Sequence, residues 1–392
     1  MKTTAIICEY NPFHKGHLLQ IEQLKKQNRT VVCIMSGGFV QRGQPAIFDK
    51  YSRAKAAVLS GADLVLELPY PFSCSSAEFF CQGGVSIANS LNIIDELYFG
   101  SECGDIELLD QTSDRLIDKQ FITALQAARK DKQNKEKPFA VLREEVYYKL
   151  YGQQLPVRPN DILGIEYINS LKKLNSKITP VTYKREEGFS ATLSRKHIED
   201  NDNYDFVPQL AADIFKNCPI FSLNNIESAI LAFYRLANAK ALEKYESMTD
   251  GMANRLVKGA NECCTLNQLL ENLSGKSYTN AKIRRAILHG MTGVLPSMLK
   301  EKPMYTQVLA ANDNGRKLIK KSQKNSSVSI LTKPAHFKKL VGKAKEQAIF
   351  SNNAEKLLTL MCDNPLSADE FFKMTPFILQ QNDQETSNTL NT

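Results

Sequence analysis

The strongest constraint on the fold is the regular alternation of short apolar runs and helical patterns over the first hundred residues. Each apolar run is long enough for a buried strand and too short for a buried helix. The expected strands are 3–8, 30–35, 63–68 and 93–99, and the helices between them are 17–27, 50–60 and 77–90. Continuous apolar strands belong to parallel sheets covered on both faces. The pattern predicts an α/β fold with a doubly wound parallel, Rossmann-like sheet, whose ligands bind at the carboxyl ends of the strands.

The remainder of the chain predicts more helix than strand. Helical patterns occupy 107–129, 139–151 and 161–174, a strand is expected at 177–185, and a helix begins near residue 191. We therefore expect a sheet domain over residues 1–200. Residues 201–379 are expected to form a mainly helical, basic region, in which two short strands flank a basic helix at 315–321. The polar tail, 380–392, is predicted to be disordered.

The charge of the chain is concentrated in one region. The whole chain has a net charge of +8, but residues 276–345 contain sixteen Lys or Arg and two acids, so the remainder is negative. Such a surplus is typical of a surface that binds a polyanion, because each neutralised phosphate releases counterions. It is equally typical of a solvated basic face without a partner, and both interpretations stay open on this feature alone.

The sequence predicts a protein of the cytoplasm. No stretch reaches the roughly 18–20 apolar residues of a membrane span, and the first residues lack the apolar core of a signal peptide. The nine cysteines are scattered without a C-x-x-C pair, as expected of thiols in a reducing compartment. Cys263 and Cys264 lack further ligands at zinc spacing, so no metal site is predicted.

The motif NPFHKGH, residues 11–17, follows the first expected strand and opens the first helix. His14 and His17 then lie on one side of the helix start, and Gly16 leaves room for a phosphate to approach the backbone. Oriented N–H groups at the helix N-terminus favour the same anion. The two imidazoles are predicted to donate to the α- and β-phosphates as pyrophosphate leaves. The alternatives are a metal-binding pair or ordinary surface residues, but the position between strand and helix favours nucleotidyl transfer.

An HxGH motif in this position resembles the nucleotidyltransferase superfamily that includes class I aminoacyl-tRNA synthetases. A narrower resemblance rests on several runs: IICEYNPFHKGH, MSGGFVQRGQPAIFDKYSRAKAAVLSGADLVLELP, LYFGSE, NDILGIEYI and the pattern R-x-x-x-x-x-A-T-x-x-R from Arg185 to Arg195. In order and spacing these runs are similar to the tRNA(Met) cytidine acetate ligases. The resemblance is close over about the first 200 residues and looser over the basic C-terminal part.

The resemblance implies an ATP-dependent ligase. Acetate and ATP would give acetyl-adenylate, and the acetyl group would pass to the wobble cytidine of elongator tRNA(Met). The implied partners are tRNA and acetate, and neither DNA nor a membrane. Mg²⁺ is expected with the ATP on chemical grounds, because the phosphoryl oxygens need charge neutralisation.

The resemblance also implies a set of site residues, with His14 and His17 as the catalytic pair. The implied ATP-binding residues are Ile7, Cys8, Glu9, Tyr10, Asn11, Pro12, Phe13, His14, Lys15, Gly16, His17, Leu18, Leu19, Gln20, Gly100, Asn160 and Arg185. At Gly100 a Cβ is expected to obstruct the adenine or ribose. Asn160 suits a nucleotide edge or a helix N-cap, and Arg185 suits the triphosphate or a plain strand surface.

Further candidates lie near this expected site. Ser190 and Thr192 occupy the place of a second phosphate-binding motif. The loop after the second strand offers Gln41, Arg42 and Asp49, of which Arg42 is a candidate for neutralising acetate or phosphate or is a surface residue of a turn. Glu67 is interpreted either as an acid that orients His or ligand, or as a strand-end carboxylate with a local partner.

In the basic region, Lys282, Arg284 and Arg285 at the start of a helix are candidate tRNA contacts. Two rival functions remain. A small-molecule adenylyl- or cytidylyltransferase needs only the sheet domain, so the long basic extension disfavours it. A non-catalytic RNA-binding protein is disfavoured by the intact His14, Gly16 and His17.

Overall fold

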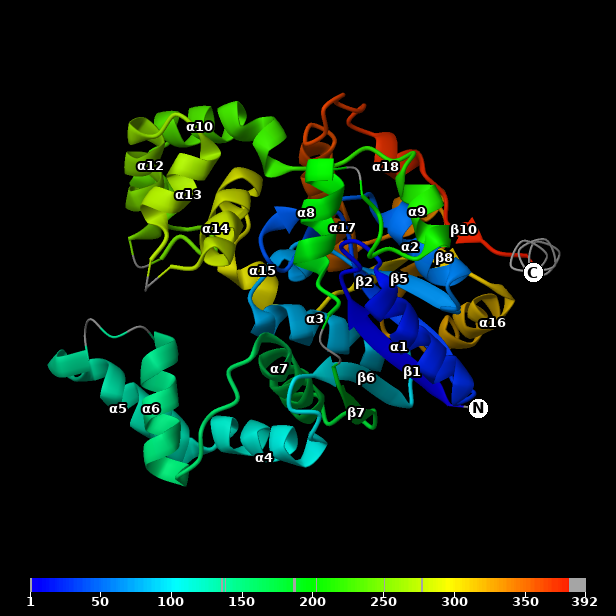
Figure 1. Cartoon of the computed structure of the whole chain (residues 1–392), viewed down its shortest axis with the longest axis horizontal. Helices are drawn as coiled ribbons and strands as arrows, with labels where there is room; N and C mark the ends of the chain where they lie inside the picture. Colours follow the sequence, from blue (N-terminus) through cyan, green and yellow to red (C-terminus); the bar gives the residue numbers. More distant parts are fainter. Residues whose placement is uncertain are drawn as a thin grey trace.

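A central sheet organises the molecule (Figure 1). The computed structural model describes residues 2–134, 137, 139–185, 188–201, 203–249, 251–275 and 278–380, so all but the first residue of the predicted disordered tail lies outside them. The strands of the sheet are β1 (Thr3–Cys8), β2 (Thr30–Ser36), β5 (Leu64–Leu68), β6 (Glu96–Ser101), β7 (Thr179–Lys184), β8 (Tyr305–Ala311), β9 (Ser329–Leu331) and β10 (Phe377–Ile378). Their order is β10-β8-β5-β2-β1-β6-β7, with β9 beside β8.

The five strands from β5 to β7 in this order pair in parallel, which confirms the predicted doubly wound sheet. Helices cover both faces: α1 (Lys15–Lys26) and α2 (Lys50–Leu59) one face, α3 (Ala77–Ser90) and α7 (Pro159–Lys173) the other. Neighbouring strand residues supply the two cores alternately. Ile6 and Cys33 pack with the helices of the first face, and Ile7 and Ile34 with those of the second.

A helical arm separates β6 from α7 in the chain. It consists of α4 (Ile106–Ile117), α5 (Lys119–Lys130), η2 (Lys132–Asn134) and α6 (Phe139–Tyr151), and α5 and α6 extend away from the sheet (Figure 1). The predicted single helix 107–129 is divided at Asp118, whose carboxylate accepts from the Gln120 amide at 2.8 Å and so caps α5. The expected N-cap role of Asn160 is wrong: Arg158 is the N-cap of α7, and Pro159 takes the first helical position.

The chain after β7 forms mostly helices. Their bounds are α8 (Ala191–Asn201), α9 (Gln209–Phe215), η3 (Leu223–Ile226), α10 (Glu227–Leu236), α11 (Ala239–Leu242), α12 (Met252–Glu262), α13 (Leu266–Leu273), α14 (Asn280–Thr292), α15 (Pro296–Lys300), α16 (Asp313–Ser322), η4 (Pro334–Lys339), α17 (Gly342–Leu358) and α18 (Glu370–Lys373). One short helix lies earlier in the chain, η1 (Phe72–Cys74) between β5 and α3. Helices α10 to α14 pack on one another as a helical unit beside the sheet. The two strands expected on either side of a basic helix are present as β8 and β9, with α16 between them.

The C-terminal strands join the same sheet as the N-terminal ones. β8 pairs antiparallel with β5, and β10 pairs parallel with β8. The boundary expected at residue 200 therefore does not coincide with the edge of the sheet. Side chains reinforce the join: Asn312 Nδ2 donates to Asp63 Oδ1 at 2.9 Å, and Thr306 Oγ1 donates to the Glu67 carbonyl at 2.7 Å.

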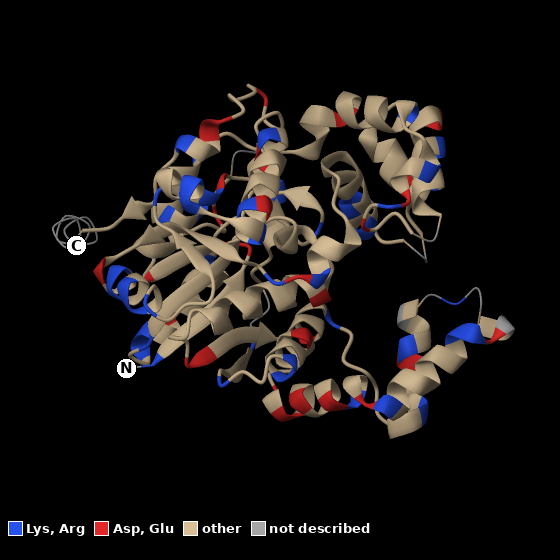
Figure 2. Cartoon of the chain, turned by 180° about the vertical axis from the view of Figure 1, so that it is seen from behind, with Lys and Arg blue, Asp and Glu red and all other residues tan. Residues whose placement is uncertain are grey.

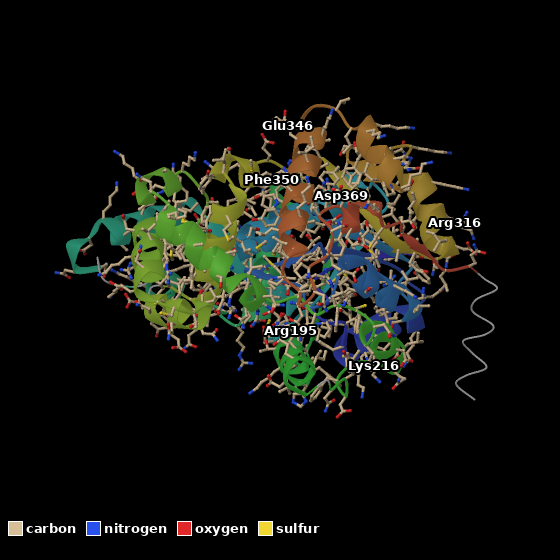
Figure 3. All side chains as sticks on the ribbon, turned by 90° about the horizontal axis from the view of Figure 1, so that it is seen from above. Arg195, Lys216, Arg316, Glu346, Phe350 and Asp369 are labelled. Atoms are coloured by element: carbon tan, nitrogen blue, oxygen red, sulfur yellow. The ribbon has the colours of Figure 1, made fainter. Side chains whose placement is uncertain are left out.

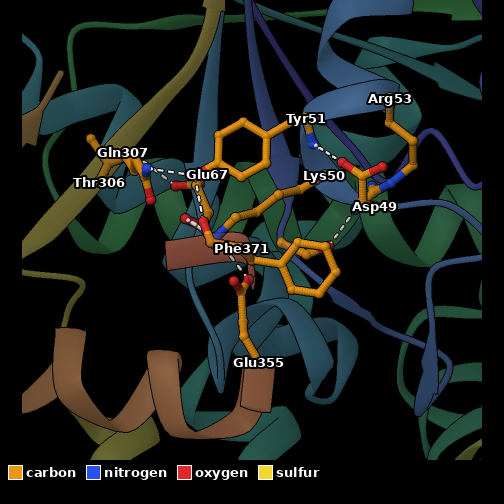
Figure 4. Close-up of polar contacts among 10 residues, drawn as sticks. Asp49, Lys50, Tyr51, Arg53, Glu67, Thr306, Gln307, Glu355 and Phe371 are labelled. Atoms are coloured by element: carbon orange, nitrogen blue, oxygen red, sulfur yellow. Dashed lines mark hydrogen bonds and ion pairs between the residues drawn. The ribbon is translucent and has the colours of Figure 1, made fainter. Parts of the chain in front are cut away.

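A buried ionic cluster also ties the two parts of the chain together (Figure 4). Lys50 Nζ lies 3.0 Å from Glu67 Oε1 on β5 and 2.7 Å from Glu355 Oε1 on α17. Burial raises the pKa of Glu67 to about 7, although Lys50 opposes the rise. One lysine thus faces two buried carboxylates that come from positions far apart in the sequence.

The helical unit touches the sheet domain through a small hairpin. The hairpin, which was not predicted, comprises β3 (Phe39–Val40) and β4 (Gln44–Pro45). Its turn holds Gly43 at φ +73°, where a Cβ would lie 2.4 Å from the backbone nitrogen of Arg285. Arg285 Nη1 donates to the Gln41 carbonyl at 2.9 Å, and Arg284 Nη1 to Gln44 Oε1 at 3.3 Å. Helix α14 is therefore fastened to this loop.

The basic surplus is divided between separate surfaces. Helix α14 belongs to the helical unit, whereas α16 packs at the other side of the sheet near the N-terminus (Figures 1 and 2). Figure 3 also shows Arg316 of α16, which is part of this surplus, well apart from Arg195 of α8, which lies outside residues 276–345. No helix in the described part of the chain is long and apolar enough to cross a membrane.

Candidate active site

A large cavity lies at the carboxyl ends of β1 and β6, where the strand order reverses. Its volume is about 690 Å³, which falls in the range of roughly 300–1,000 Å³ that is usual for small-molecule sites. β1 leads to β2 and β5 on one side, and β6 leads to β7 on the other. Such a switch point is where doubly wound sheets bind their ligands. His14, Gly16 and His17 line this cavity.

The two histidines form the start of α1 and cap it through their own rings. His14 is the N-cap, and its Nδ1 accepts from the Gly16 amide at 3.1 Å. His17 Nδ1 accepts from the His14 amide at 3.2 Å. Because Nδ1 of each neutral ring is an acceptor, its proton lies on Nε2, on the side of the ring away from these amides. The rings stack with centroids 3.6 Å apart.

Both imidazoles are held in the neutral form. Burial, together with the nearby positive charges of Arg185 and Arg195, lowers the pKa of His14 to about 4. The pKa of His17 is also well below its ordinary value. Burial is the main cause, and the charges of His14 and Arg185 act in the same direction. Near neutral pH the pair therefore offers two Nε2–H donors without having to gain protons.

The backbone of the motif differs from the expectation in one respect. The first amides of α1 were expected to face an anion, but the Lys15 amide donates to the Phe206 carbonyl at 2.9 Å, and the Gly16 amide to the His14 ring. A Cβ on Gly16 would lie 3.0 Å from His14 Cε1 and from Phe189 Cβ. The glycine makes room for the ring stack, so the histidine rings supply the donors at this end of the helix.

A second group of residues forms the opposite wall at β6, β7 and α7. Arg185 Nη1 donates to Asn160 Oδ1 at 2.9 Å, and Asn160 Nδ2 donates to Glu102 Oε1 at 2.7 Å. A Cβ on Gly100 would lie 2.6 Å from Arg185 Cγ and 2.9 Å from Tyr183 Cζ. Gly100 thus makes room for protein side chains, where the sequence suggested room for adenine or ribose. The structure brings Gly100, Asn160 and Arg185 together around the cavity.

The structure places most of the expected ATP-binding residues at this cavity. Those that line it are Ile7, Cys8, Glu9, Tyr10, Asn11, His14, Gly16, His17, Leu19, Gln20, Gly100, Asn160 and Arg185. Four expected residues do not line it: Pro12, Phe13, Lys15 and Leu18. Phe13 belongs to the hydrophobic core and Lys15 is exposed, because successive side chains of the run point in different directions.

The first turn of α8 completes the cavity and supplies residues that sequence reasoning missed. Ser190 and Thr192 line it as expected. Arg195, one turn further, donates through Nη1 to the Asn11 carbonyl at 2.6 Å and through Nη2 to Thr192 Oγ1 at 3.2 Å. Arg42 Nη1 reaches the same hydroxyl at 3.5 Å. Arg195 closes the R-x-x-x-x-x-A-T-x-x-R pattern, and Glu102 stands in LYFGSE, so both were visible in the sequence as motif members without a role.

Other candidates have structural roles. Asp49 Oδ1 accepts from the Tyr51 and Ser52 amides and caps α2. Glu67 has the local partner Lys50, which is one of its two expected roles. Lys282, Arg284 and Arg285 do not line the cavity, and Lys282 Nζ stands 4.7 Å from the ring centroid of Tyr278.

The described residues contain no group of three or more His, Cys, Asp or Glu side chains that could hold a metal ion. Among the described residues that line the cavity, Glu9 is the single carboxylate, and its Oε1 accepts from the Gln41 amide at 2.9 Å. Burial raises the pKa of Glu9 above its ordinary value, while this hydrogen bond opposes the rise. The cavity therefore presents mainly donors and cations to a ligand.

Comparisons with known proteins show the family of this chain. The family model of the HIGH nucleotidyl transferases matches residues 1–370. The tRNA(Met) cytidine acetate ligase of Clostridium perfringens is 34% identical over 364 residues, covering 85% of this chain and 90% of the relative. Its counterpart in Caldanaerobacter subterraneus subsp. tengcongensis is 35% identical over 387 residues, covering 91% and 95%.

Solved structures extend the likeness to the whole fold. The crystal structure of Thermotoga maritima TmcAL bound with alpha-thio ATP superposes with a TM-score of 0.90 at 27% identity, covering 97% of this chain and 100% of that one. The apo form of the same protein gives a TM-score of 0.89 at 26% identity, with the same coverage. This chain therefore belongs to the tRNA(Met) cytidine acetate ligase family of the HIGH nucleotidyl transferases.

Proposed function

We propose that this protein is an ATP-dependent ligase that acetylates the wobble cytidine of elongator tRNA(Met). Acetate and ATP react to give acetyl-adenylate and pyrophosphate, and the acetyl group then passes to the cytidine with release of AMP. The relatives named tRNA(Met) cytidine acetate ligase support the acceptor and the acid, and the neighbour bound with an ATP analogue supports the nucleotide. We assign the ATP to the cavity at the carboxyl ends of β1 and β6.

One observation carries this proposal: the stacked His14 and His17 rings, each with its proton on Nε2, in a cavity that also contains Arg185 and Arg195. An acetate oxygen attacks the α-phosphorus of ATP, a new P–O bond forms, and the bond to the β-phosphate oxygen breaks. Negative charge grows on the leaving pyrophosphate. Neutral donors that are already oriented stabilise this charge without reorganisation.

The second step forms an amide. The exocyclic amine of cytidine attacks the acetyl carbonyl carbon, the new C–N bond forms, and the bond from that carbon to the AMP oxygen breaks. The amine loses one proton, and AMP leaves with the electron pair. Arg42 and Thr192, which line the cavity and are joined by a hydrogen bond of 3.5 Å, are placed to hold the carboxylate or the acyl phosphate.

Mg²⁺ would accompany the ATP and neutralise its phosphates. Among the described lining residues, Glu9 alone offers a carboxylate. Most ligands of the ion would therefore come from phosphate oxygens and water, as is usual for Mg²⁺. We assign tRNA binding to the helical unit and to the basic residues that follow it, with the parallel strands and α1 to α8 as the catalytic part. A tRNA substrate places the enzyme in the cytoplasm.

Labelled acetate tests the proposal directly. The purified protein should incorporate label into bulk tRNA only when ATP is present, and it should catalyse acetate-dependent ATP–pyrophosphate exchange without tRNA. Label found in a free nucleotide and absent from tRNA would favour a small-molecule transferase. Absence of both activities, with intact folding by circular dichroism, would contradict the assignment.

A further inference from the structure

A second cavity of about 320 Å³ adjoins the candidate active site. Arg42, Thr192 and Arg195 line both cavities, so they form the wall between them. The other walls come from the hairpin strand β4, from α8, from residues 221–224, and from α13 and α14 of the helical unit. The second cavity thus lies where the helical unit meets the catalytic part.

The polar side of this cavity is cationic. Arg42, Arg195, Lys196 and Arg284 line it, against one acid, Glu199, among the described lining residues. None of these four cations forms an ion pair within 4.0 Å among the described residues. Burial lowers the pKa of Arg284, and the like charge of Arg42 lowers it further. A bound anion would relieve both effects, and a phosphate matches the forked geometry of arginine.

The other side of the cavity suits a base. Phe221 and Leu266 contribute buried apolar surface. The amides of Asn224 and Asn267 also line the cavity, and each can both donate and accept a hydrogen bond. RNA-binding proteins recognise unstacked bases with this combination of apolar surface and polar side chains. The volume of about 320 Å³ lies in the range of roughly 300–1,000 Å³ for bound small molecules.

We propose that this second cavity receives the acceptor nucleotide of the RNA, with its flanking phosphate against Arg284 and Lys196 and its base turned toward the wall of Arg42 and Thr192. The inference rests on the proposed function. It adds a separate binding place for the acceptor, beside the cavity in which the acid is activated. An enzyme that modifies a base must take it out of its stack and hold it in a pocket, which this cavity provides.

A substitution that fills the cavity tests this assignment. Asn267 is exposed on α13 and lines the cavity, so Asn267→Trp should occupy it without disturbing the core. We expect single-turnover acetyl transfer to tRNA to fall at least about tenfold, because a misplaced acceptor loses its orientation toward the acyl group. Acetate-dependent ATP–pyrophosphate exchange should change less than about twofold, since that half-reaction needs no acceptor. Asn353→Trp, an equal change at an exposed residue of α17 outside both the cavity lining and the helical unit, is the matched control.

The cationic side is tested by Lys196→Gln, with Lys216→Gln at an exposed residue outside both the cavity lining and the helical unit as the control. Lys196→Gln should raise the KM for tRNA several-fold and make it less sensitive to salt, by up to about one unit of log–log slope. Replacing tRNA by cytidine 5′-monophosphate distinguishes RNA from a free nucleotide. We expect this probe to be acetylated at less than about 1% of the rate for tRNA, because it lacks the phosphate contacts that position the RNA.

The outcomes separate this inference from the proposed function. Unchanged transfer by both cavity variants, or an equal loss of exchange and transfer, would overturn the acceptor assignment while leaving the ligase intact. Acetylation of the free nucleotide at a rate comparable to tRNA would overturn the RNA part. Absence of exchange and transfer in the unmodified protein would overturn the proposed function and the acceptor site with it.

Discussion

The histidine pair shows how a few backbone hydrogen bonds set the chemistry of a side chain. The ring nitrogens that cap α1 are Nδ1 of His14 and Nδ1 of His17, and each cap fixes the remaining proton on Nε2. Burial keeps both rings neutral by lowering their pKa values. The cap of the helix and the donors for the proposed leaving group are therefore the same two rings.

We predict that the donor at Nε2 matters more than the ring itself. His14→Ala or His17→Ala should lower pyrophosphate release at least about a hundredfold, the usual loss for one removed donor to developing charge. His14→Gln places an amide N–H near the position of Nε2 and should retain more activity than His14→Ala. His336→Ala, outside the cavity, is the control. Near-normal release by both alanine variants would contradict the assignment of the motif.

The lowered pKa values also predict how stability depends on pH. His289, buried on α14, has a pKa lowered to about 4 by burial, and its Nε2 contacts the Cys74 carbonyl at 2.8 Å. Between pH 6.5 and 4 the unfolded chain binds a proton at this residue and the folded chain does not. The free energy of unfolding therefore falls as the pH falls through this window, by up to about 1.4 kcal/mol per pH unit for each such histidine.

Urea titrations at pH 7, 6 and 5 measure this dependence. His289→Asn should reduce the loss of stability between pH 7 and pH 5, whatever its effect at pH 7. Parallel losses in His289→Asn and the unmodified protein would show that His289 titrates normally in the folded chain.

At the residue scale the sequence predicted positions better than roles. His14, Gly16, His17, Gly100, Asn160 and Arg185 all line one cavity, as expected from motifs at strand ends. The two glycines, however, make room for protein side chains. A motif shows which position must be a glycine. The side chain that occupies the freed space can come from a distant segment, which only the folded structure identifies.

Among the elements, α14 has a position that its sequence did not indicate. Lys282, Arg284 and Arg285 were expected to contact tRNA phosphates from a free basic face, yet Arg284 and Arg285 hold the hairpin loop that contains Arg42. Their spacing on a helix is the same in both cases, because periodicity reports which residues share a face and not what that face touches. Replacing all three would therefore disturb the wall of the cavity as well as any tRNA contact.

We predict that Gly43→Ala will separate α14 from the hairpin. The new Cβ would meet the Arg285 backbone nitrogen at 2.4 Å, and φ +73° adds conformational strain. Gly152 has φ +66°, and a Cβ added there would meet no described atom within 4 Å, so this position isolates the strain alone. Gly152→Ala should cost about 1–2 kcal/mol of stability, and Gly43→Ala clearly more.

The two alanine variants should also differ in activity. Gly43→Ala should lower acetyl transfer, because the loop carries Arg42 between the two cavities, whereas Gly152→Ala should leave it unchanged. Equal stability and activity in the two variants would show that the contact between α14 and the hairpin is not needed.

For the whole molecule, the parallel strands of the sheet were predictable, but the addition of β8 and β10 at its edge was not. Apolar runs and intervening helices indicated β1, β2, β5, β6 and β7, whose parallel partners lie within the first 184 residues. β8 was recognised as a strand, but its pairing with β5 joins segments about 240 residues apart, as in the hydrogen bond from Thr306 to the Glu67 carbonyl. Neither periodicity nor charge in either segment specifies the partner, because many buried strands would satisfy the same pattern.

Because β5 pairs with β8, we predict that the first 200 residues do not fold alone. Fragments 1–204 and 1–300 both lack β8, so β5 would expose an apolar edge, and Lys50 and Glu67 would lose Glu355. We expect both fragments to be aggregated or to unfold without a cooperative transition, and co-expression of 1–300 with 301–392 to restore a soluble complex. Fragment 1–300 is the informative comparison, because it keeps the whole helical unit and lacks only the strands and helices that follow. Gel filtration and thermal unfolding by circular dichroism give the measurement. A monomeric fragment 1–204 with a cooperative transition would mean that the parallel strands are self-sufficient, and that β8, the ionic cluster and β10 were added to a sheet already stable without them.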